Sequence, residues 1–567
     1  MTLVLRRQRI AAAAAALLAL AFAAGCGDSS PTQPEDVPLL ESLQVMPGDS
    51  AQPGDELWIL YSVFDTAGVT RSVLSFSGAF TQEIETNEHG VRTGNLGIRV
   101  PIPHEAQPGA ALTVKLTIYN AKSHSASRTA PPIAIVDDVA PRVTGGPLAL
   151  SGYVAGTAPE VAKGVGETLG LEIRATDNHQ ITWMGYRLGP PANVADSIAV
   201  NSANGAFDPR LVVPAAWLGT SSITLFARDA GGRLTEMVPS ADHFQVYPVR
   251  SATPRTASLA ELPTDYAYDA RRDLLYLLLP NARSVAVFSV GTLTYDTPIV
   301  FDEAPAGIDL SLSADSLLVT LPEARALGVV AVAQTGRPVS QIPLVYDTTH
   351  ARKPDRVRVA ANGKAIVSLR AGDVTAGPRL IEYDLGTGLQ HPRTELGLDG
   401  SAAAPTLLVH SWDRTQILAI NGSPCCGGSG MVYVSARDVF TRSAGAEVAP
   451  GLPATADSVG RGYVNGGSYL TADLTSSRWI APPDFHAYYY SPSALSPDGA
   501  HAYFVSGLGY KTVNVADGSM VEAVTLSTTS SDTSPMEQLY RFIALPGGDR
   551  LVGWTWNGDK LLVISPR

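Results

Sequence analysis

The chain of 567 residues has little cysteine, little charge and few long apolar runs. Its three cysteines are too few for a small domain held together by several disulfides. Charged residues make up 17% of the sequence and the formal net charge is −12. No cluster of basic residues occurs, so we expect no nucleic-acid partner. Only residues 10–24 form a long apolar run, so we expect the rest of the chain to lie outside the membrane.

Signatures of catalysis and of metal binding are also missing. No serine has glycine at both the second preceding and the second following position, as a nucleophile elbow requires, and no phosphate-binding loop is present. The ten histidines contain no pair spaced as in His-x-x-x-His, and there is no EF-hand loop. We therefore expect no catalytic residue, no cofactor and no metal site.

The first 26 residues have the parts of an export signal. Arg6, Arg7 and Arg9 form a positive segment, residues 10–24 form the apolar run, and small residues precede Cys26. The run is shorter than the ~20 residues of a membrane-spanning helix and has the length of a signal-peptide core. The pattern resembles the lipobox of bacterial lipoproteins, although alanine stands where that family usually has leucine.

This resemblance implies that residues 1–25 are a signal peptide and that Cys26 carries the lipid that holds the mature protein to a membrane of the cell envelope. Residues 26–37 are polar, acidic and rich in proline, which is typical of a disordered tether. Gly27 follows the cysteine, where lipoproteins retained at the inner membrane tend to have aspartate. We therefore expect the outer membrane rather than the inner one.

The mature chain has the composition of an all-β protein, because glycine, proline, serine, threonine and valine are plentiful and favour short strands and turns. Residues 38–139 predict one β-sandwich. Residues 57–65 form a strong strand candidate that ends in a turn, and residues 112–119 alternate between apolar and polar side chains.

Residues 140–249 repeat this theme and predict a second β-sandwich. The run at residues 169–177 matches the first strand candidate of the preceding domain, and residues 221–232 match its alternating strand. Each domain has about 100 residues, the size of an immunoglobulin domain, but neither has the cysteines of the disulfide-linked type. The pattern resembles the cysteine-free immunoglobulin-like modules of bacterial surface proteins.

Residues 250–567 have a repeat of about 45–50 residues, which is typical of a β-propeller. The clearest unit is Ser-Pro-Asp-Gly at 496–499 followed by strands at 501–505 and 512–515. This unit resembles the YVTN/lactonase-like propeller repeat. The same kind of turn precedes an apolar strand at five other places, residues 270–273, 313–316, 361–364, 412–415 and 546–549.

Seven blades follow from this spacing. The interval between Asp413 and Asp498 is twice the usual length, so we expect a degenerate blade around residues 463–480. Residues 256–262 are expected to pair with the last strand, at residues 561–564, and thereby to close the ring. Closure removes the exposed sheet edges that favour aggregation.

Cys425 and Cys426 are adjacent in a loop rich in glycine. Consecutive Cα atoms lie ~3.8 Å apart, whereas ordinary disulfides prefer ~4.4–6.8 Å. A disulfide between these two cysteines is therefore strained, and in an oxidising compartment it forms a rigid kink. The alternative is a pair of inert thiols.

An aromatic segment is the other candidate for a binding surface. It consists of Phe485, His486, Tyr488, Tyr489 and Tyr490, placed in a loop between blades. The cysteine loop connects the second and third strands of its blade, so both loops are expected on the same propeller face. Tyrosine gives large contact area at low entropic cost. The alternative is a buried strand with alternate rings in the core.

These observations favour a lipid-anchored envelope protein whose propeller is a non-catalytic binding or scaffolding module for a protein or glycan. The alternative is a periplasmic propeller enzyme, either a lactonase-like hydrolase or an accessory subunit of a dehydrogenase. An enzyme requires acids, histidine or arginine converging at the mouth of the central channel. A binding module requires only a broad polar or aromatic face.

Overall fold

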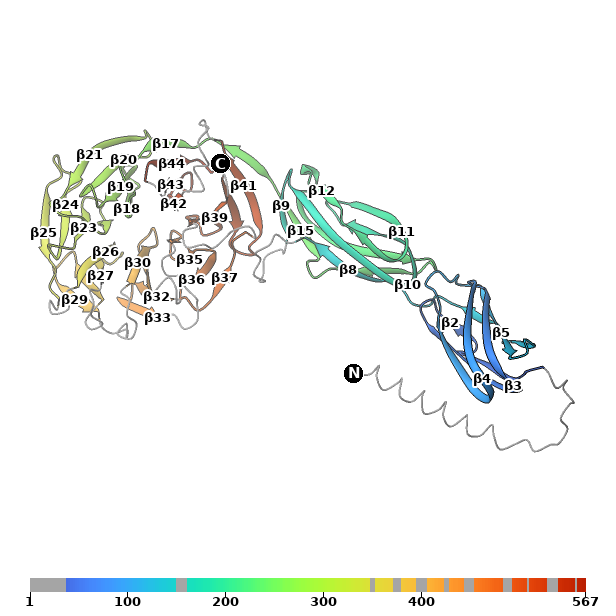
Figure 1. Cartoon of the computed structure of the whole chain (residues 1–567). Coiled ribbons are helices and arrows are strands. Elements are labelled where there is room, and N and C mark those ends of the chain that lie inside the picture. The colour runs from blue at the N-terminus through green and yellow to red at the C-terminus, as the bar shows by residue number, and fades with distance from the viewer. Residues whose placement is uncertain are drawn as a thin grey trace.

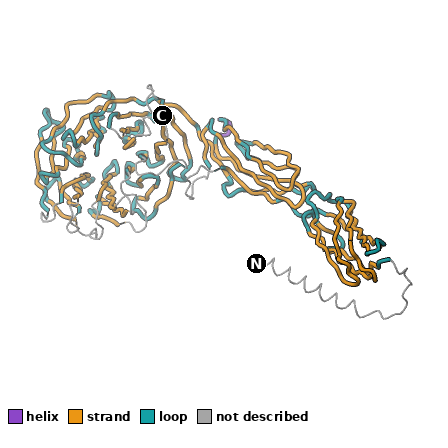
Figure 2. Tube along the Cα trace, in the orientation of Figure 1, coloured by secondary structure: helices purple, strands orange, loops and turns teal. Residues whose placement is uncertain are grey.

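The computed structural model describes residues 37–148, 161–346, 352–370, 379–393, 405–422, 428–442, 453–482, 492–506, 509–527, 539–555 and 558–566. They form an elongated all-β molecule, in which two sheet units extend from a ring of sheets (Figure 1). The described part contains one helix, the single 3-10 turn η1 (Ala215–Trp217) (Figure 2). No helix within these ranges is long and apolar enough to cross a membrane.

The first sheet unit has one buried apolar core of its own. Its strands pair in the order β1-β3-β5-β7-β2, with β4 beside β3 and β6 beside β5. They are β1 (Leu39–Met46), β2 (Ser50–Ala51), β3 (Glu56–Gly78), β4 (Gln82–Pro101), β5 (Ala111–Asn120), β6 (Ser125–Thr129) and β7 (Ile133–Ile135). The alternation predicted at residues 112–119 is confirmed, because every second side chain of β5 is buried.

The strand predicted at residues 57–65 does not end in a turn. β3 continues past Asp65 through a β-bulge, at which its register with β4 shifts. The Asp65 carboxylate accepts hydrogen bonds from the amides of Ala67 and Gly68, at 2.6 and 2.9 Å. Gly68 has a φ of +86°, which glycine adopts without steric cost. The turn signal in the sequence therefore marks a kink within one long strand.

The second sheet unit has a separate core and the strand order β11-β10-β13-β15-β9, with β8 and β12 beside β10 and β14 beside β13. Its strands are β8 (Arg142–Pro147), β9 (Ala162–Gly164), β10 (Thr168–Leu188), β11 (Val194–Phe207), β12 (Arg210–Val212), β13 (Gly219–Asp229), β14 (Leu234–Met237) and β15 (His243–Tyr247).

The similarity that the sequence indicates between the two units extends to their hydrogen-bond register. In the first unit the strand resumes after its bulge at Val69, which pairs with Asn120, the last residue of β5. In the second unit β10 also carries an irregularity, and it resumes at Ile181, which pairs with Asp229, the last residue of β13. Asn120 and Asp229 therefore occupy equivalent positions.

Seven antiparallel sheets form the ring, and the seven-bladed β-propeller predicted from the repeat is confirmed. Four blades are built from consecutive strands in the first two thirds of the ring. They are β18 (Asp265–Asp269), β19 (Leu274–Leu279), β20 (Ser284–Ser289) and β21 (Thr294–Val300); β22 (Ile308–Leu310), β23 (Leu317–Leu321), β24 (Ala326–Val330) and β25 (Val339–Pro343); β26 (Lys353–Val359), β27 (Lys364–Arg370), β28 (Leu380–Asp384) and β29 (Gln390–Arg393); and β30 (Pro405–His410), β31 (Gln416–Gly422), β32 (Gly428–Val434) and β33 (Val439–Arg442).

The other three blades complete the ring. They are β34 (Ala454–Ala456), β35 (Gly462–Asn465), β36 (Ser468–Thr471) and β37 (Ser477–Trp479); β38 (Ser493–Leu495), β39 (His501–Ser506), β40 (Gly509–Asn514) and β41 (Met520–Leu526), joined by β16 (Val249–Ala252); and β42 (Leu539–Ala544), β43 (Leu551–Thr555) and β44 (Lys560–Ile564), joined by β17 (Arg255–Ser258). The degenerate blade expected around residues 463–480 is the β34–β37 sheet.

The predicted closure of the ring is confirmed. β17 pairs with β44 in antiparallel register, with Thr256 opposite Leu562, so the seventh blade contains strands from both ends of the propeller. Parallel pairing of β16 with β41 adds a fifth strand to the sixth blade, which the repeat spacing does not predict. Arg250 of β16 forms a bidentate ion pair with Glu522 of β41, with hydrogen bonds of 2.7 and 3.0 Å.

The second sheet unit is fastened directly to the sixth blade. The Gln245 side chain donates to the carbonyl of Met520 at 2.7 Å and accepts from its amide at 2.9 Å. Tyr247 is buried in a cluster with Phe504 and other apolar residues of the blade. Hydrogen bonds and apolar burial therefore act together at this joint, and we infer that it is stiff.

Candidate functional site

The residues singled out from the sequence lie outside the described residues. This holds for Cys26, for Cys425 and Cys426, and for the aromatic segment at 485–490. The described strands on either side of the cysteine pair are β31 and β32 of the fourth blade, and those on either side of the aromatic segment are β37 and β38. Their roles stay predictions.

A cavity lined by several charged side chains lies at the centre of the propeller. It has a volume of about 190 Å³, and each blade contributes at least one lining residue from its innermost strand. These residues include Tyr266, Asp309, Arg358, His410, Thr455, Leu495 and Arg541. The volume corresponds to about six water molecules. A single small chemical group therefore fits there.

Asp265 and Arg358 form one buried ion pair beside this cavity. The Arg358 guanidinium donates to both carboxylate oxygens, at 2.6 and 3.0 Å. The amides of Tyr266 and Ile308 donate to the same carboxylate, at 3.0 and 3.1 Å. Burial by itself raises the pKa of Asp265, but the charges of Arg358 and Arg356 outweigh burial and hold the pKa below its usual value. The Asp265 carboxylate therefore stays ionised, and both of its oxygens accept hydrogen bonds.

Asp309 is the centre of a second charged group. Its carboxylate accepts hydrogen bonds from the amides of Leu310 and Val359, at 2.8 and 2.7 Å, and from Arg414 at 3.2 Å. His410 Nε2 lies 3.3 Å from the same carboxylate. Burial raises the pKa of Asp309, but the charges of Arg414 and His410 outweigh burial and hold the pKa far below its usual value.

His410 lies between two oxygen atoms. Its Nε2 is 3.3 Å from the Asp309 carboxylate, and its Nδ1 is 2.8 Å from the carbonyl oxygen of Ser411. The ring therefore connects Asp309 of the second blade to the backbone of the fourth.

Arg541, on the innermost strand of the seventh blade, differs from the other arginines of the cavity. Within the described ranges its guanidinium has neither a carboxylate partner nor a hydrogen bond, and its one ring contact is with Tyr540, 6.0 Å from the ring centroid. Burial lowers the pKa of Arg541 and outweighs the opposing effects of Tyr540, Tyr266 and Asp265, while the positive charge of Arg356 acts in the same direction as burial. A cation in such surroundings favours an anion as its neighbour.

Aromatic rings lie beside this arginine. Tyr266, Tyr268 and Trp412 line the same cavity. Trp412 packs edge-on against Tyr268, with ring centroids 6.4 Å apart, and against His410 at 6.2 Å. Such rings provide flat apolar surfaces for the carbon skeleton of a ligand, and the arginine provides charge.

Arginine is in excess at the cavity. Arg358, Arg414 and Arg541 line it together with Asp309, and the adjoining Asp265 pairs with Arg358 and lies 3.7 Å from Arg356. Both aspartates are saturated with hydrogen bonds, so neither has a free oxygen with which to act as a base or nucleophile. Arg541, which forms no hydrogen bond with an acid in the described residues, is a cation. A guanidinium can attract an anion but cannot accept a proton from it.

Sequence reasoning missed these residues, although a signal for them exists. Asp309 is a single charge between two apolar residues, and Asp265 begins a short strand that also ends in an aspartate; both strands enter the core of a propeller, where an unpaired carboxylate is costly. That signal predicts partners but does not identify them. Arg358 is 93 positions away from Asp265, and Arg414 is 105 positions away from Asp309.

Comparison with known proteins provides little further information. No protein-family profile matches the chain, and no curated protein matches it significantly. Among solved structures, the β-propeller domain of Cps50 (Swd1) from Myceliophteria thermophila is similar, with a TM-score of 0.40 and 9% sequence identity, over 55% of this chain and 100% of that one. Likeness at this level says nothing about function.

Proposed function

We propose that this chain is a lipid-anchored envelope protein whose propeller is a non-catalytic binding module, and that its central cavity holds an anionic group of a protein or glycan partner. The observation that carries the proposal is Arg541, a half-buried guanidinium that forms no hydrogen bond with an acid in the described residues, in a cavity that also contains Arg358 and Arg414. A partly desolvated cation of this kind favours an anion as its neighbour, and a bound carboxylate would supply one.

The proposed architecture supports this role. The sequence pattern around Cys26 predicts the lipid anchor. The shared register of the two sheet units is what tandem immunoglobulin-like domains require, and we propose that these units are spacers. They extend from one side of the propeller (Figure 1) and separate it from the anchored end of the chain. The membrane expected is the outer membrane.

The binding proposal is tested with the full chain and small carboxylates. Acetate and glucuronate, with glucose as the neutral counterpart, are titrated into the wild type and an Arg541→Gln variant. We expect glucuronate to raise the unfolding temperature of the wild type and glucose not to do so, and the variant to lose the response. An equal response of both proteins to glucuronate would show that the anion binds elsewhere.

The predicted second surface, formed by the cysteine loop and the aromatic segment, is tested separately. Tyr489→Ala and Cys425→Ser variants are used as bait in pull-downs from the native envelope. We expect at least one of them to lose a partner that the wild type retains. Unchanged partners for both variants would remove these loops from the binding surface.

A specific observation keeps the enzymatic alternative open, namely the convergence of Asp309, His410 and Arg414 at the cavity. We propose that this group is structural, because its members satisfy one another. The test is hydrolysis of a panel of lactones by the wild type and by a His410→Gln variant. Turnover that depends on His410 would favour the lactonase-like hydrolase over the binding module.

A further inference from the structure

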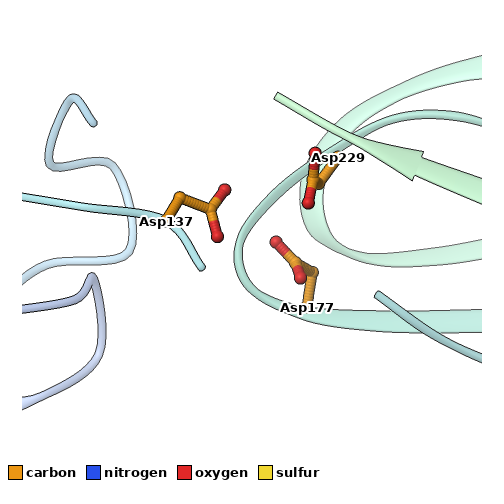
Figure 3. Close-up of side chains that lie close together, drawn as sticks. All are labelled: Asp137, Asp177 and Asp229. Carbon is orange, nitrogen blue, oxygen red and sulfur yellow. The ribbon is translucent and has the colours of Figure 1, made fainter. Parts of the chain in front are cut away.

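Three aspartates meet where the first sheet unit joins the second (Figure 3). Asp137 belongs to the link between β7 and β8, Asp177 lies in the irregular part of β10, and Asp229 ends β13. Each offers one carboxylate oxygen to a group whose members all lie within 4.8 Å of one another. The Asp137 side chain is only 1% exposed. Three carboxylates are therefore held together, and two of them, Asp137 and Asp229, are buried.

Each of these carboxylates keeps at least one oxygen free. The amide of His179 donates to Asp177 at 3.0 Å, and the amide of Arg233 donates to Asp229 at 2.7 Å. The second oxygen of each, and both oxygens of Asp137, are buried without a hydrogen-bond donor in the described part of the chain. Backbone hydrogen bonds therefore position Asp177 and Asp229, and each leaves one oxygen without a donor. Asp137 has no donor for either oxygen.

Neighbouring positive charge does not neutralise the cluster. The Arg233 guanidinium lies 4.0 Å from the Asp137 carboxylate, too far for a hydrogen bond. Burial, followed by the charges of Asp177 and Asp229, raises the pKa of Asp137. Four buried acceptor oxygens without donors are costly, so the arrangement is incomplete without a further positive group.

We propose that Asp137, Asp177 and Asp229 bind a calcium ion that fastens the first sheet unit to the second. Carboxylate oxygens are the ligands that calcium prefers, at ~2.3–2.6 Å. Two oxygens on opposite sides of one such ion stand about 5 Å apart, which fits the 4.8 Å limit of the cluster. Magnesium needs shorter bonds and a stricter octahedron. The sequence predicted no metal site because it has no EF-hand loop.

The equivalent position in the first unit serves as an internal comparison. There Asp65 corresponds to Asp177, and Asn120 corresponds to Asp229. The Asn120 amide donates to the Asp65 carboxylate at 3.0 Å, so the pair is satisfied without an ion. In the second unit an acid replaces that amide, and the link supplies a third acid. Asp229 accepts a hydrogen bond at the position where Asn120 donates one, so the second unit needs a cation to balance its carboxylates.

The site lies beside the direct contacts between the two units. His104 of the first unit contacts the carbonyl of Asn178 at 2.6 Å, and His179 of the second contacts the carbonyl of His104 at 2.5 Å. Asn178 and His179 directly follow Asp177 in the sequence. An ion bound to Asp137 on the link and to two strands of the second unit therefore fixes the point at which the first unit hinges.

The test uses the purified full chain, stripped with EDTA and then titrated with calcium. Calorimetry is expected to show about one tightly bound ion per chain, and an Asp137→Asn variant is expected to bind calcium at least about tenfold more weakly. Calcium should also protect the link around residues 138–141 from proteolysis in the wild type. Asp138→Asn is the matched control, because Asp138 is exposed and outside the cluster.

The sign of the stability change provides a second readout. Without calcium, Asp137→Asn removes one of three repelling charges and should unfold at a higher temperature than the wild type. With calcium the order should reverse, because only the wild type gains from the ion. The absence of calcium binding by the wild type, an equal response of the two variants, or magnesium acting as well as calcium would overturn the proposal.

Discussion

Arg358 and Asp265 join the third blade of the propeller to the first, through two hydrogen bonds of 2.6 and 3.0 Å. The pair lies beside the central cavity, and both side chains are less than a tenth exposed. It therefore connects blades that are not neighbours in the sequence of the ring. We regard it as a brace for the same inner strands that position the proposed anion site.

Removing one partner of this brace should destabilise the propeller strongly. Asp265→Ala leaves Arg358 as a buried, uncompensated charge, for which the expected loss is about 3–5 kcal/mol. The measurement is urea unfolding followed by tryptophan fluorescence. A double variant with Arg358→Leu should lose less than the sum of the two single changes. Additive losses would show that the two charges do not depend on each other.

Replacing Arg541 should stabilise the free protein, whereas replacing Asp265 should destabilise it. Because Arg541 is half-buried and forms no hydrogen bond with a carboxylate in the described structure, Arg541→Leu removes a partly desolvated charge without breaking an ion pair. We expect the free protein to gain about 0.5–2 kcal/mol of stability and to lose its response to carboxylates. Arg358→Leu is the matched control, and it should destabilise. A loss of stability in Arg541→Leu would mean that the arginine has a structural partner.

Acid should weaken the propeller through Asp309. Its pKa is lower in the folded protein than its usual value, so its contribution to stability is complete above the unfolded pKa of about 3.9. The contribution is lost as the pH falls below that value towards the folded pKa. Between pH 5 and pH 3, Asp309→Asn should show a shallower loss of stability, by up to about 1.4 kcal/mol per pH unit.

The control for this titration is the exposed Asp302. Unfolding of Asp302→Asn should follow the pH profile of the wild type. If Asp309→Asn followed it as well, the charges around Asp309 would not be what stabilises the folded state in this range.

Ring closure should depend on the packing of the last strand. Leu561 is fully buried between the first and seventh blades, and Leu561→Ala should cost about 2–5 kcal/mol because of the cavity it leaves. Leu312→Ala, at a position that is 50% exposed, should change stability by less than about 0.5 kcal/mol. Equal effects in thermal unfolding would contradict the closed ring.

The lipid anchor is tested by fractionation. Cys26→Ala removes the only thiol of the predicted lipobox, so the protein should leave the membrane fraction. A protein that stays bound to membranes after a carbonate wash would show that another part of the chain holds it there.

Much of the architecture could be predicted because it depends on local signals. Turns of the Ser-Pro-Asp-Gly kind recur at a nearly constant spacing, and a hairpin needs only its own turn and flanking apolar residues. The seven blades and the closing pair of Thr256 and Leu562 follow from that spacing. The bulge at Asp65 was misjudged, because the same residues favour a turn and a bulge, and pairing with neighbouring strands decides between them.

The two charged sites depend on contacts that no local pattern contains. The residues of the central cavity come from seven separate blades, and the three junction aspartates are separated by 40 and 52 positions along the chain. Each is an ordinary aspartate or arginine in its own strand. The ring and the junction bring these charges together, and electrostatic energy in a buried site depends on separations of a few ångströms. Spacing along the chain therefore determines the blades, whereas folding decides which charges become partners and which, like Asp137, lack a hydrogen-bond donor in the described structure.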